Sequence, residues 1–178
     1  FNADGSRFVS TSMDQTARIW ATDGSASPIE LKGHCGGVVA AAWSDDASRI
    51  VTASEDFTAR VWDGQTGAFL FALEHDGEVL GATFSHDGKR IAAAAHKNGL
   101  RIWNADGSGE PQILRGHEDV VHAVAWSPDG STIASCGSDN TVRSWRADGS
   151  GTPIVLRHSS IVYTVAFSTD GKHIVSSS

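Results

Sequence analysis

The sequence predicts an all-β fold built from repeated four-stranded antiparallel sheets. Tryptophan and histidine residues recur at a nearly constant spacing along the whole chain of 178 residues, which indicates stacked structural repeats. Glycine is abundant, with 19 residues that fall mostly in Asp-Gly steps, and such steps favour tight turns between short strands. No stretch carries the sustained 3.6-residue periodicity of an amphipathic helix.

The repeat is visible in two residue types. Tryptophans stand 42, 41 and 42 residues apart at Trp20, Trp62, Trp103 and Trp145. Histidines stand 41, 42 and 41 residues apart at His34, His75, His117 and His158. Each histidine is followed by a tryptophan after 28 residues wherever the chain extends that far. The length variation therefore lies between a tryptophan and the next histidine, where we expect a surface loop.

One repeat shows the expected elements in order. Four short runs follow one another, VVHAVAW from 120, STIASC from 131, TVRSW from 141 and PIVL from 153, each separated by turn residues. Their β-branched and apolar residues favour strands of four to seven residues joined by tight turns. A four-stranded unit of this size cannot bury its faces alone, so it must stack on its neighbours.

These features resemble the WD40 repeat family. Gly-His dipeptides at 33 and 116, endings such as SEDFTARVW and a period of 41 to 42 residues recur in register over the entire chain. The resemblance implies a β-propeller of four-stranded antiparallel blades, of which this chain supplies about four repeats. The segments ADGSGEPQILRGHED and ADGSGTPIVLRH also resemble the WD40 tails of large bacterial multidomain signalling proteins.

The family pattern divides the chain into five parts. It implies a partial blade with strands B to D at 1–33, full blades at 34–74, 75–116 and 117–157, and a partial blade with strands A and B at 158–178. We expect an excerpt of a larger ring, which in the family often has seven blades, and a native N-terminus upstream of Phe1. The alternatives are a small ring of four to five blades and self-association with a second copy through open blade edges.

The resemblance also implies a buried hydrogen-bond network in each blade. Its members are the Gly-His histidine, a Ser or Thr eight residues before the tryptophan, an Asp six residues before it, and the tryptophan itself. The matching residues are His34, Ser54, Asp56 and Trp62; His75 and Trp103; His117, Asp139 and Trp145; Ser12, Asp14 and Trp20; and His158. Gly137 stands where the third full blade should carry the hydroxyl.

The blade at 75–116 departs furthest from the pattern. Ala95 and Lys97 replace the expected hydroxyl and carboxylate, and Glu74 replaces the Gly-His glycine. An unsatisfied buried network weakens a core, so we expect this blade to be the least rigid. Lys97 could alternatively be a binding feature.

Two catalytic interpretations are disfavoured. The recurring Ser, His and Asp suggest a hydrolase, but no G-x-S-x-G motif occurs and these serines lie on expected internal strands. The hexapeptide HEDVVH at 117–122 suggests a zinc site, but its histidines are five apart and lead into a strand, whereas the protease motif needs a spacing of four on a helix. We expect no catalytic residue, no metal site and no cofactor.

The positions that differ between blades are the candidates for binding a partner. In the family, contact side chains on the top face lie three and five residues after the Gly-His histidine and one residue before the network Asp. The three sets are Gly37, Glu78, Val120 and Ile161; Val39, Leu80, His122 and Tyr163; and Met13, Glu55, His96 and Ser138. Val120, His122, Ile161 and Tyr163 are expected to form one apolar patch with polar edges. The alternative for the aliphatic members is ordinary strand packing.

Composition narrows the function further. The net charge is −7, from 14 basic and 21 acidic residues, which disfavours a nucleic-acid surface. No apolar run is long enough to cross a membrane, and two isolated cysteines favour a reducing, cytoplasmic location. We therefore predict a non-catalytic protein–protein interaction scaffold or sensor platform that binds a peptide or protein. The alternative is a ligand-binding or enzymatic propeller with its site in the central channel.

Overall fold

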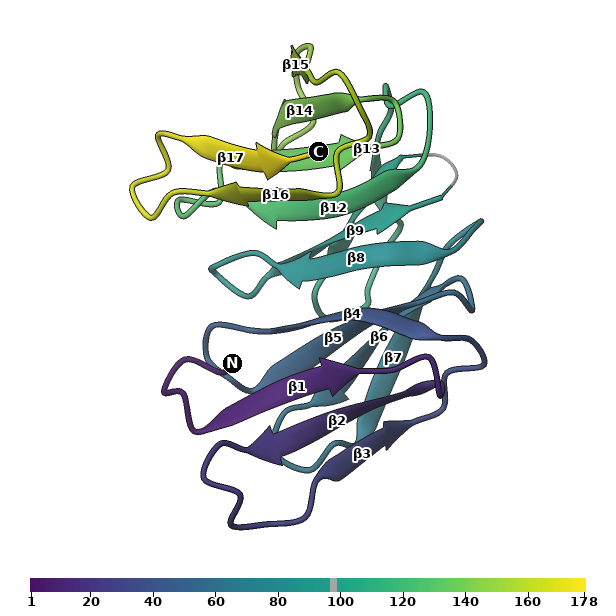
Figure 1. Cartoon of the computed structure of the whole chain (residues 1–178), viewed down its shortest axis with the longest axis vertical. Coiled ribbons are helices and arrows are strands. Elements are labelled where there is room, and N and C mark those ends of the chain that lie inside the picture. The colour runs from purple at the N-terminus through teal and green to yellow at the C-terminus, as the bar shows by residue number, and fades with distance from the viewer. Residues whose placement is uncertain (97–98) are drawn as a thin grey trace.

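The protein is a stack of β-sheets. The computed structural model describes residues 1–96 and 99–178, and every regular element in that part of the chain is a β-strand (Figure 1). The strands are β1 Arg7–Thr11, β2 Thr16–Ala21, β3 Ile29–Lys32, β4 Val38–Trp43, β5 Arg49–Ser54, β6 Thr58–Asp63, β7 Phe69–Glu74, β8 Val79–Phe84, β9 Arg90–Ala95, β10 Leu100–Asn104, β11 Gln112–Leu114, β12 Val121–Trp126, β13 Thr132–Gly137, β14 Thr141–Arg146, β15 Ile154–Arg157, β16 Thr164–Phe167 and β17 Ile174–Ser177. The described part of the chain contains no helix with the length and hydropathy of a membrane span.

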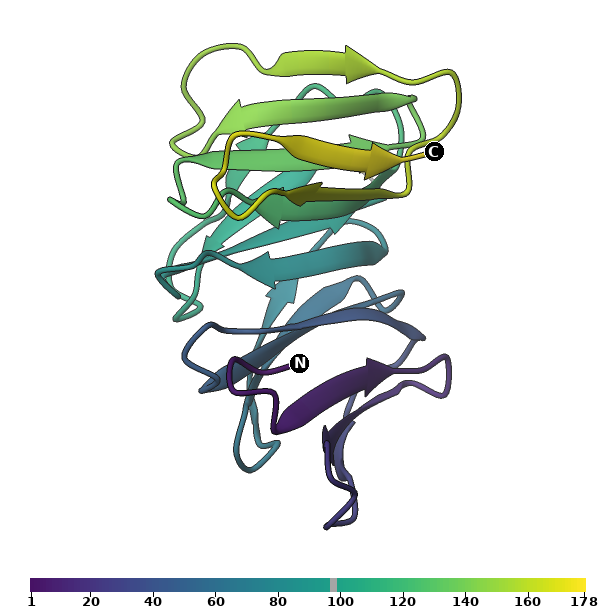
Figure 2. The same cartoon turned by 60° about the vertical axis from the view of Figure 1, so that its left-hand side comes forward.

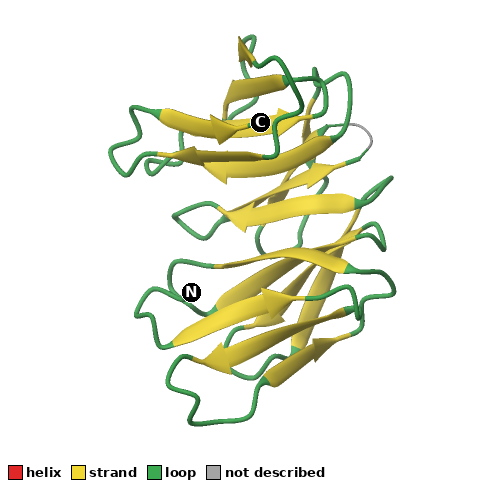
Figure 3. Ribbon diagram, in the orientation of Figure 1, coloured by secondary structure: helices red, strands yellow, loops and turns green. Residues whose placement is uncertain are grey.

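The strands form five antiparallel sheets in chain order. Three sheets have four strands, β4–β7, β8–β11 and β12–β15, while β1–β3 has three strands and β16–β17 has two. Each strand pairs with its neighbour in sequence, so every connection within a sheet is a hairpin (Figure 3). The predicted all-β fold of four-stranded antiparallel sheets is confirmed.

The five sheets are arranged as an open arc. The β1–β3 sheet lies at one end and β16–β17 packs at the other, as both views show (Figures 1 and 2). The inner strands β4, β8, β12 and β16 lie beside one another in that order. The molecule is therefore an open partial propeller.

The apolar core lies between neighbouring sheets rather than inside any one of them. Leu31 and Ile19 of the first sheet share one buried cluster with Trp62 and Ile50 of the second. Similar clusters join β4–β7 to β8–β11, β8–β11 to β12–β15, and β12–β15 to β16–β17. Each sheet is thus stabilised by the burial of apolar area against its neighbours, as expected for stacked repeats.

Arginines at the first residues of β1, β5 and β9 also join neighbouring sheets. Arg90 on β9 donates to the carbonyl oxygens of Ala147 at 2.8 Å and Gly130 at 3.0 Å, both in turns of the next sheet. Arg49 on β5 donates in the same way to Gly88, at 2.7 Å, and to Ala105. Arg7 on β1 donates to Gly64 of the second sheet at 3.2 Å. Three consecutive sheets are therefore held to the next one by a charge-assisted hydrogen bond at the same repeat position.

Candidate functional site

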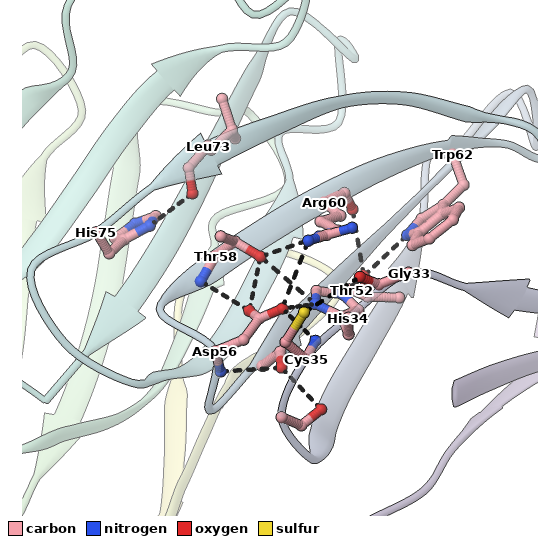
Figure 4. Close-up of polar contacts among 12 residues, drawn as sticks. Gly33, His34, Cys35, Thr52, Asp56, Thr58, Arg60, Trp62, Leu73 and His75 are labelled. Carbon is pink, nitrogen blue, oxygen red and sulfur yellow. Dashed lines mark hydrogen bonds and ion pairs between the residues drawn. The ribbon is translucent and has the colours of Figure 1, made fainter. Parts of the chain in front are cut away.

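The sheet β4–β7 contains a closed network of buried polar side chains (Figure 4). His34 Nδ1 lies 2.7 Å from the Asp56 carboxylate, and His34 Nε2 lies 2.7 Å from the Thr52 hydroxyl. A carboxylate only accepts, so Nδ1 carries the proton, and the Thr52 hydroxyl donates to Nε2. The same hydroxyl oxygen accepts the indole N–H of Trp62 at 2.9 Å. Every polar atom of this chain of contacts therefore has a partner.

The hydroxyl in the network is Thr52, so the prediction of Ser54 is wrong. Trp62 pairs with Ile50 across β5 and β6, and Thr52 is the next residue on that face. Ser54 lies one further step toward the turn, where its hydroxyl donates to Gly36 O and accepts Asp56 N–H. The linking hydroxyl therefore stands ten residues before the tryptophan, not eight.

The same correction applies to two other sheets. Ser135 links His117 Nε2, at 2.7 Å, to the Trp145 indole, at 2.8 Å. The network of β12–β15 is therefore complete, although Gly137 was predicted to remove its hydroxyl. In the first sheet Trp20 donates to Ser10 at 2.8 Å, whereas the predicted Ser12 only accepts the Asp14 N–H. The predicted contact of His117 with Asp139, at 2.8 Å, is present.

The sheet β8–β11 has a reduced network. Ala93 stands at the hydroxyl position, and the Trp103 indole donates directly to His75 Nε2 at 3.4 Å. His75 Nδ1 donates to the Leu73 carbonyl at 3.0 Å in place of a carboxylate. Lys97 lies outside the described residues. The lower rigidity of this sheet stays a prediction.

Burial sets the charge of these groups. Burial lowers the pKa of His34 and His117, and it lowers the pKa of His75 to about 4. Burial alone would raise the pKa of Asp56, but hydrogen bonds from Thr58, the Cys35 N–H and His34 lower it to about 2. The histidines are thus neutral and the aspartate is charged near neutral pH. The side chains of His34 and His117 are completely buried, so this arrangement offers a substrate no access to an imidazole.

The glycine of each Gly-His dipeptide is required by backbone conformation and by steric contact. Gly33 and Gly116 adopt φ values of +143° and +152°, which disfavour other residues. A Cβ on Gly33 would lie 2.9 Å from the guanidinium of Arg60, and one on Gly116 would lie 2.7 Å from that of Arg143. The missing side chain therefore leaves room for the arginine that reaches the network carboxylate at Asp56 or Asp139.

The predicted binding residues gather at one end of the inner strands. In three sheets the residue that precedes the network Asp position donates its backbone N–H to a carbonyl oxygen. The acceptor is the residue three positions after the histidine of the same sheet. These pairs are Glu55 to Gly37 at 3.0 Å, His96 to Glu78 at 2.8 Å, and Ser138 to Val120 at 2.8 Å. The first and third predicted sets are therefore adjacent in space.

A β-bulge in each of β4, β8 and β12 sets the position of the second group of predicted binding residues. The strand register slips between Val38 and Ala40, between Val79 and Gly81, and between Val121 and Ala123. The extra residues are Val39, Leu80 and His122, which are three of the predicted contact residues. A bulge redirects a side chain and bends the strand, and bulges are frequent next to binding sites. Sequence reasoning predicted these positions but not the bulge that produces them.

One cluster on this face joins two sheets. His122 Nε2 lies 2.8 Å from the Ser138 hydroxyl, and its ring centroid lies 5.3 Å from that of Tyr163 in the last sheet. Tyr163 is 56% exposed. Val120, two residues before His122, and Ile161, two residues before Tyr163, are half-buried. We call His122, Ser138, Tyr163, Val120 and Ile161 the aromatic patch. His96 is also exposed. Burial lowers the pKa of His122, against the opposing effect of Asp119, and the nearby His96 lowers it further.

Other predicted binding residues are buried or lie far from the aromatic patch. Gly37 is buried, with Met13 and Glu55 placed directly over it. Val39 is half-buried and packs against the core between the second and third sheets. Met13 is 66% exposed on the first sheet, far along the arc from the aromatic patch.

Surface hollows lie at the opposite end of the strands. Two open hollows of about 490 Å³ each are lined by the turns around Gly88 and Gly130, together with Arg49 and Arg90. Both arginines are already hydrogen-bonded to carbonyl oxygens there. Over residues 1–96 and 99–178, no three His, Cys, Asp or Glu side chains are placed to hold one metal ion.

Comparison with known families agrees with the repeat pattern. A family model described as "WD domain, G-beta repeat" matches residues 1–21, 26–63, 67–104, 109–146 and 152–178. The first matched segment contains two strands of the first sheet, and each later segment begins with the outer strand of one sheet and continues with strands of the next. A search of curated proteins found no match.

Proposed function

Because this chain belongs to the WD40 repeat family, we propose that it is a non-catalytic platform that binds a peptide or protein through the aromatic patch. WD40 repeats are commonly protein-interaction scaffolds, so the family supports the class of function. The observation that carries the choice of surface is the bulge at His122, which directs an imidazole onto Tyr163 and Ser138.

The chemistry of the patch supports a peptide ligand. Tyr163 offers a rigid, 56% exposed aromatic side chain against the His122 ring, and the half-buried Val120 and Ile161 add aliphatic side chains two residues before His122 and Tyr163. Aromatic residues with an apolar body and a polar edge are the usual anchors of protein interfaces. His96 and Ser138 provide polar groups at the margin that could bond a peptide backbone. We infer a ligand with an apolar side chain flanked by exposed backbone.

A scaffold role is also supported by the state of the polar networks. Their histidines are buried and fully occupied in holding strands together. Their repetition in several sheets indicates a structural role, because stacked repeats need the same internal bonds in each copy. The acidic net charge of −7 supports a protein partner over nucleic acid.

We further infer a cytoplasmic setting and a role in bacterial multidomain signalling. Cys35 and Cys136 are both free thiols, as is usual in a reducing compartment. The ADGSG segments at 105–109 and 147–151 support the signalling context.

The test is a selection of peptides on the chain from a displayed random library. We expect wild-type protein to enrich peptides with a shared apolar residue. Their affinity should fall by about tenfold, about 1.4 kcal/mol, in Tyr163→Ala or His122→Ala. Met13→Ala is the matched control, because Met13 is similarly exposed on the same face but belongs to the first sheet. Thermal unfolding should be unchanged in all three variants.

Two results would contradict the proposal. Peptides that bind Tyr163→Ala as tightly as wild type would place the binding surface elsewhere. A large loss of thermal stability in His122→Ala and Tyr163→Ala would show that both residues are core residues.

A further inference from the structure

The outer strand β7 presents a free sheet edge. Within its sheet the strand order is β4-β5-β6-β7, and among the described strands β7 pairs only with β6. Sheets lie on both faces of this one, and their apolar clusters hold Leu73 of β7 on one face and Trp62 of β6 on the other. β7 is therefore firmly placed, and its free edge is a template for pairing with another strand.

The outer strands β3, β11 and β15 carry a device that β7 lacks. A proline stands directly before each of them, at Pro28, Pro111 and Pro153, and proline protects an edge because it has no N–H to donate. The residue before β7 is Ala68. β7 is also longer, with six residues where the other three strands have four, three and four. Its sequence thus leaves open an edge that the other outer strands protect.

Two large apolar side chains of β7 lie on the surface. Phe69 is 50% exposed and Leu70 is 45% exposed. The Phe69 ring is held edge-on to the Trp62 ring, with centroids 5.6 Å apart. Leu70 is the extra residue of a β-bulge between Phe69 and Phe71, and a bulge interrupts regular pairing. An added strand is therefore limited to the part of β7 from Phe71 onward, beside an apolar surface formed by Phe69 and Leu70.

The backbone of β7 directs donors and acceptors to its free side. His75 donates its N–H to the Phe57 carbonyl at 2.9 Å, so these two residues form a hydrogen-bonded pair. Such pairs alternate with non-hydrogen-bonded pairs along an antiparallel ladder, so Glu74 and Ala72 direct their N–H and C=O groups away from β6. Arg101 already donates to the Glu74 carbonyl at 3.0 Å. The N–H and C=O of Ala72 and the N–H of Glu74 are therefore the groups that an added strand would bond.

The charge around β7 favours a basic partner. Residues 61–88 contain no Lys or Arg, and their five acidic residues are Asp63, Glu74, Asp76, Glu78 and Asp87. The nearby arginines are already paired, Arg60 with Asp56 at 3.7 Å and Arg101 with Asp76. Asp63 and Glu74 stand at the two ends of the β7 edge. Like charge thus opposes a second copy of the chain at this edge, whereas a partner with lysine or arginine is attracted to it.

Strand pairing sets the spacing of the partner residues. Phe69 pairs with Trp62, and Glu74 pairs with Thr58. Trp62 and Thr58 are four residues apart on β6, so Phe69 and Glu74 face the same side of the sheet in spite of the bulge. On an added strand, the residues beside Phe69 and Glu74 should therefore also stand four residues apart.

We propose that β7 binds an extended segment of a partner protein as an added antiparallel strand, in which a lysine or arginine stands four residues before an apolar residue. The basic side chain contacts the Glu74 carboxylate, the apolar side chain covers Phe69 and Leu70, and the backbone of the segment bonds Ala72. The order follows from antiparallel pairing, which all three strand pairs of this sheet adopt. In strand addition, main-chain hydrogen bonds supply affinity and alternate side chains supply specificity. β7 is thus a docking site distinct from the aromatic patch, which lies on the last two sheets.

The first test is fluorescence anisotropy of a labelled peptide of valine and threonine that carries a lysine four residues before a leucine. We expect saturable binding to the chain, weakened about tenfold by Glu74→Lys because the charge contact becomes repulsive. Replacing the lysine of the peptide with glutamate should restore binding to the Glu74→Lys variant. Glu110→Lys is the matched control, since Glu110 is exposed shortly before the outer strand β11. Circular dichroism should show that both variants keep the sheet content of the wild type.

The second test locates the peptide by hydrogen exchange. The backbone amides of Ala72 and Glu74 should exchange more slowly when the peptide is bound. The proposal is overturned by an absence of binding, by equal binding to Glu74→Lys, or by equal binding of a peptide whose lysine and leucine are three residues apart. Protection confined to another surface would overturn it as well. Slow exchange at Ala72 in a self-associated chain without peptide would assign the edge to a second copy instead.

Discussion

Each buried histidine needs a hydrogen-bond partner on both ring nitrogens. The partner of Nε2 also determines how the tryptophan of the same sheet is bonded. In β4–β7 the Thr52 hydroxyl bonds the imidazole and the indole at once. In β8–β11 the equivalent residue is Ala93, which has no hydroxyl, and Trp103 Nε1 donates directly to His75 Nε2 at 3.4 Å. The reduced network thus differs from a complete one at both ring nitrogens, since His75 Nδ1 donates to the Leu73 carbonyl and not to a carboxylate.

Thr52→Val should therefore cost more stability than Ser54→Ala. Valine has the shape of threonine but leaves His34 Nε2 and the Trp62 N–H buried without partners, at about 1–3 kcal/mol each. Ser54→Ala should cost only about 1 kcal/mol, because Ser54 bonds the backbone near a turn. Urea unfolding monitored by tryptophan fluorescence measures both changes. Equal losses, or a greater loss for Ser54→Ala, would mean that the hydroxyl of the network has been misassigned.

The sequence alone could not identify this hydroxyl. The family resemblance implied a hydroxyl eight residues before the tryptophan, and Ser54 at that position carries one just as Thr52 does, although Gly137 at the same position does not. The choice depends on strand register, since Trp62 faces Ile50 and Trp145 faces Ile133. Register is set by pairing across the hairpin, which a pattern along the chain does not determine.

Individual strands carry the contacts that hold one sheet to the next. Arg7, Arg49 and Arg90 stand 42 and 41 residues apart, at the first residues of β1, β5 and β9. Arg49 and Arg90 also lie over an aromatic ring of the inner strand, at 5.2 Å from Phe84 and 4.6 Å from Trp126. Arg49 and Arg90 thus each combine two carbonyl contacts in the next sheet with a cation–π contact.

Arg90→Met should loosen the junction between β8–β11 and β12–β15. Methionine keeps the apolar stem but loses the hydrogen bonds to Gly130 and Ala147, and we expect a loss of about 1–3 kcal/mol in the free energy of unfolding. Arg146→Met, on an exposed residue at the end of β14, is the control and should change stability by less than about 0.5 kcal/mol. Denaturant titration of both variants gives the comparison. Similar values for the two variants would show that the arginine contacts do not stabilise the junction.

Elements were easier to predict than their contacts. The strands VVHAVAW and TVRSW were predicted from β-branched residues between turns, and the structure places β12 at Val121–Trp126 and β14 at Thr141–Arg146. The arginine contacts were missed, although their spacing follows the same period. Arginine is common on strand surfaces, and only the structure shows which carbonyl oxygens lie within reach of its head group.

On the scale of the whole molecule, stability comes from repeated interfaces between sheets. The buried clusters each draw residues from two sheets, so no sheet is stable without a neighbour. The period predicted this stacking.

Acid should weaken the whole stack well before its carboxylates are protonated. The buried histidines His34, His75 and His117 lie in three successive sheets, and burial lowers the pKa of each, to about 4 for His75. A histidine whose pKa is lower in the folded state binds more protons when unfolded. Stability is therefore lost as pH falls through the ordinary histidine value of 6.5 toward about 4.

For His75 alone, a shift from 6.5 to about 4 corresponds to about 3 kcal/mol lost over that window. The pKa of Asp56 is lowered to about 2, so its contribution is lost only below the ordinary aspartate value and does not confuse the result. Urea unfolding of dilute protein at pH 7, 5.5 and 4.5 measures the slope. His75→Gln should flatten it, because glutamine occupies the site without titrating. A wild-type stability that is constant between pH 7 and 4.5 would mean that these imidazoles are protonated as easily in the fold as in the unfolded chain.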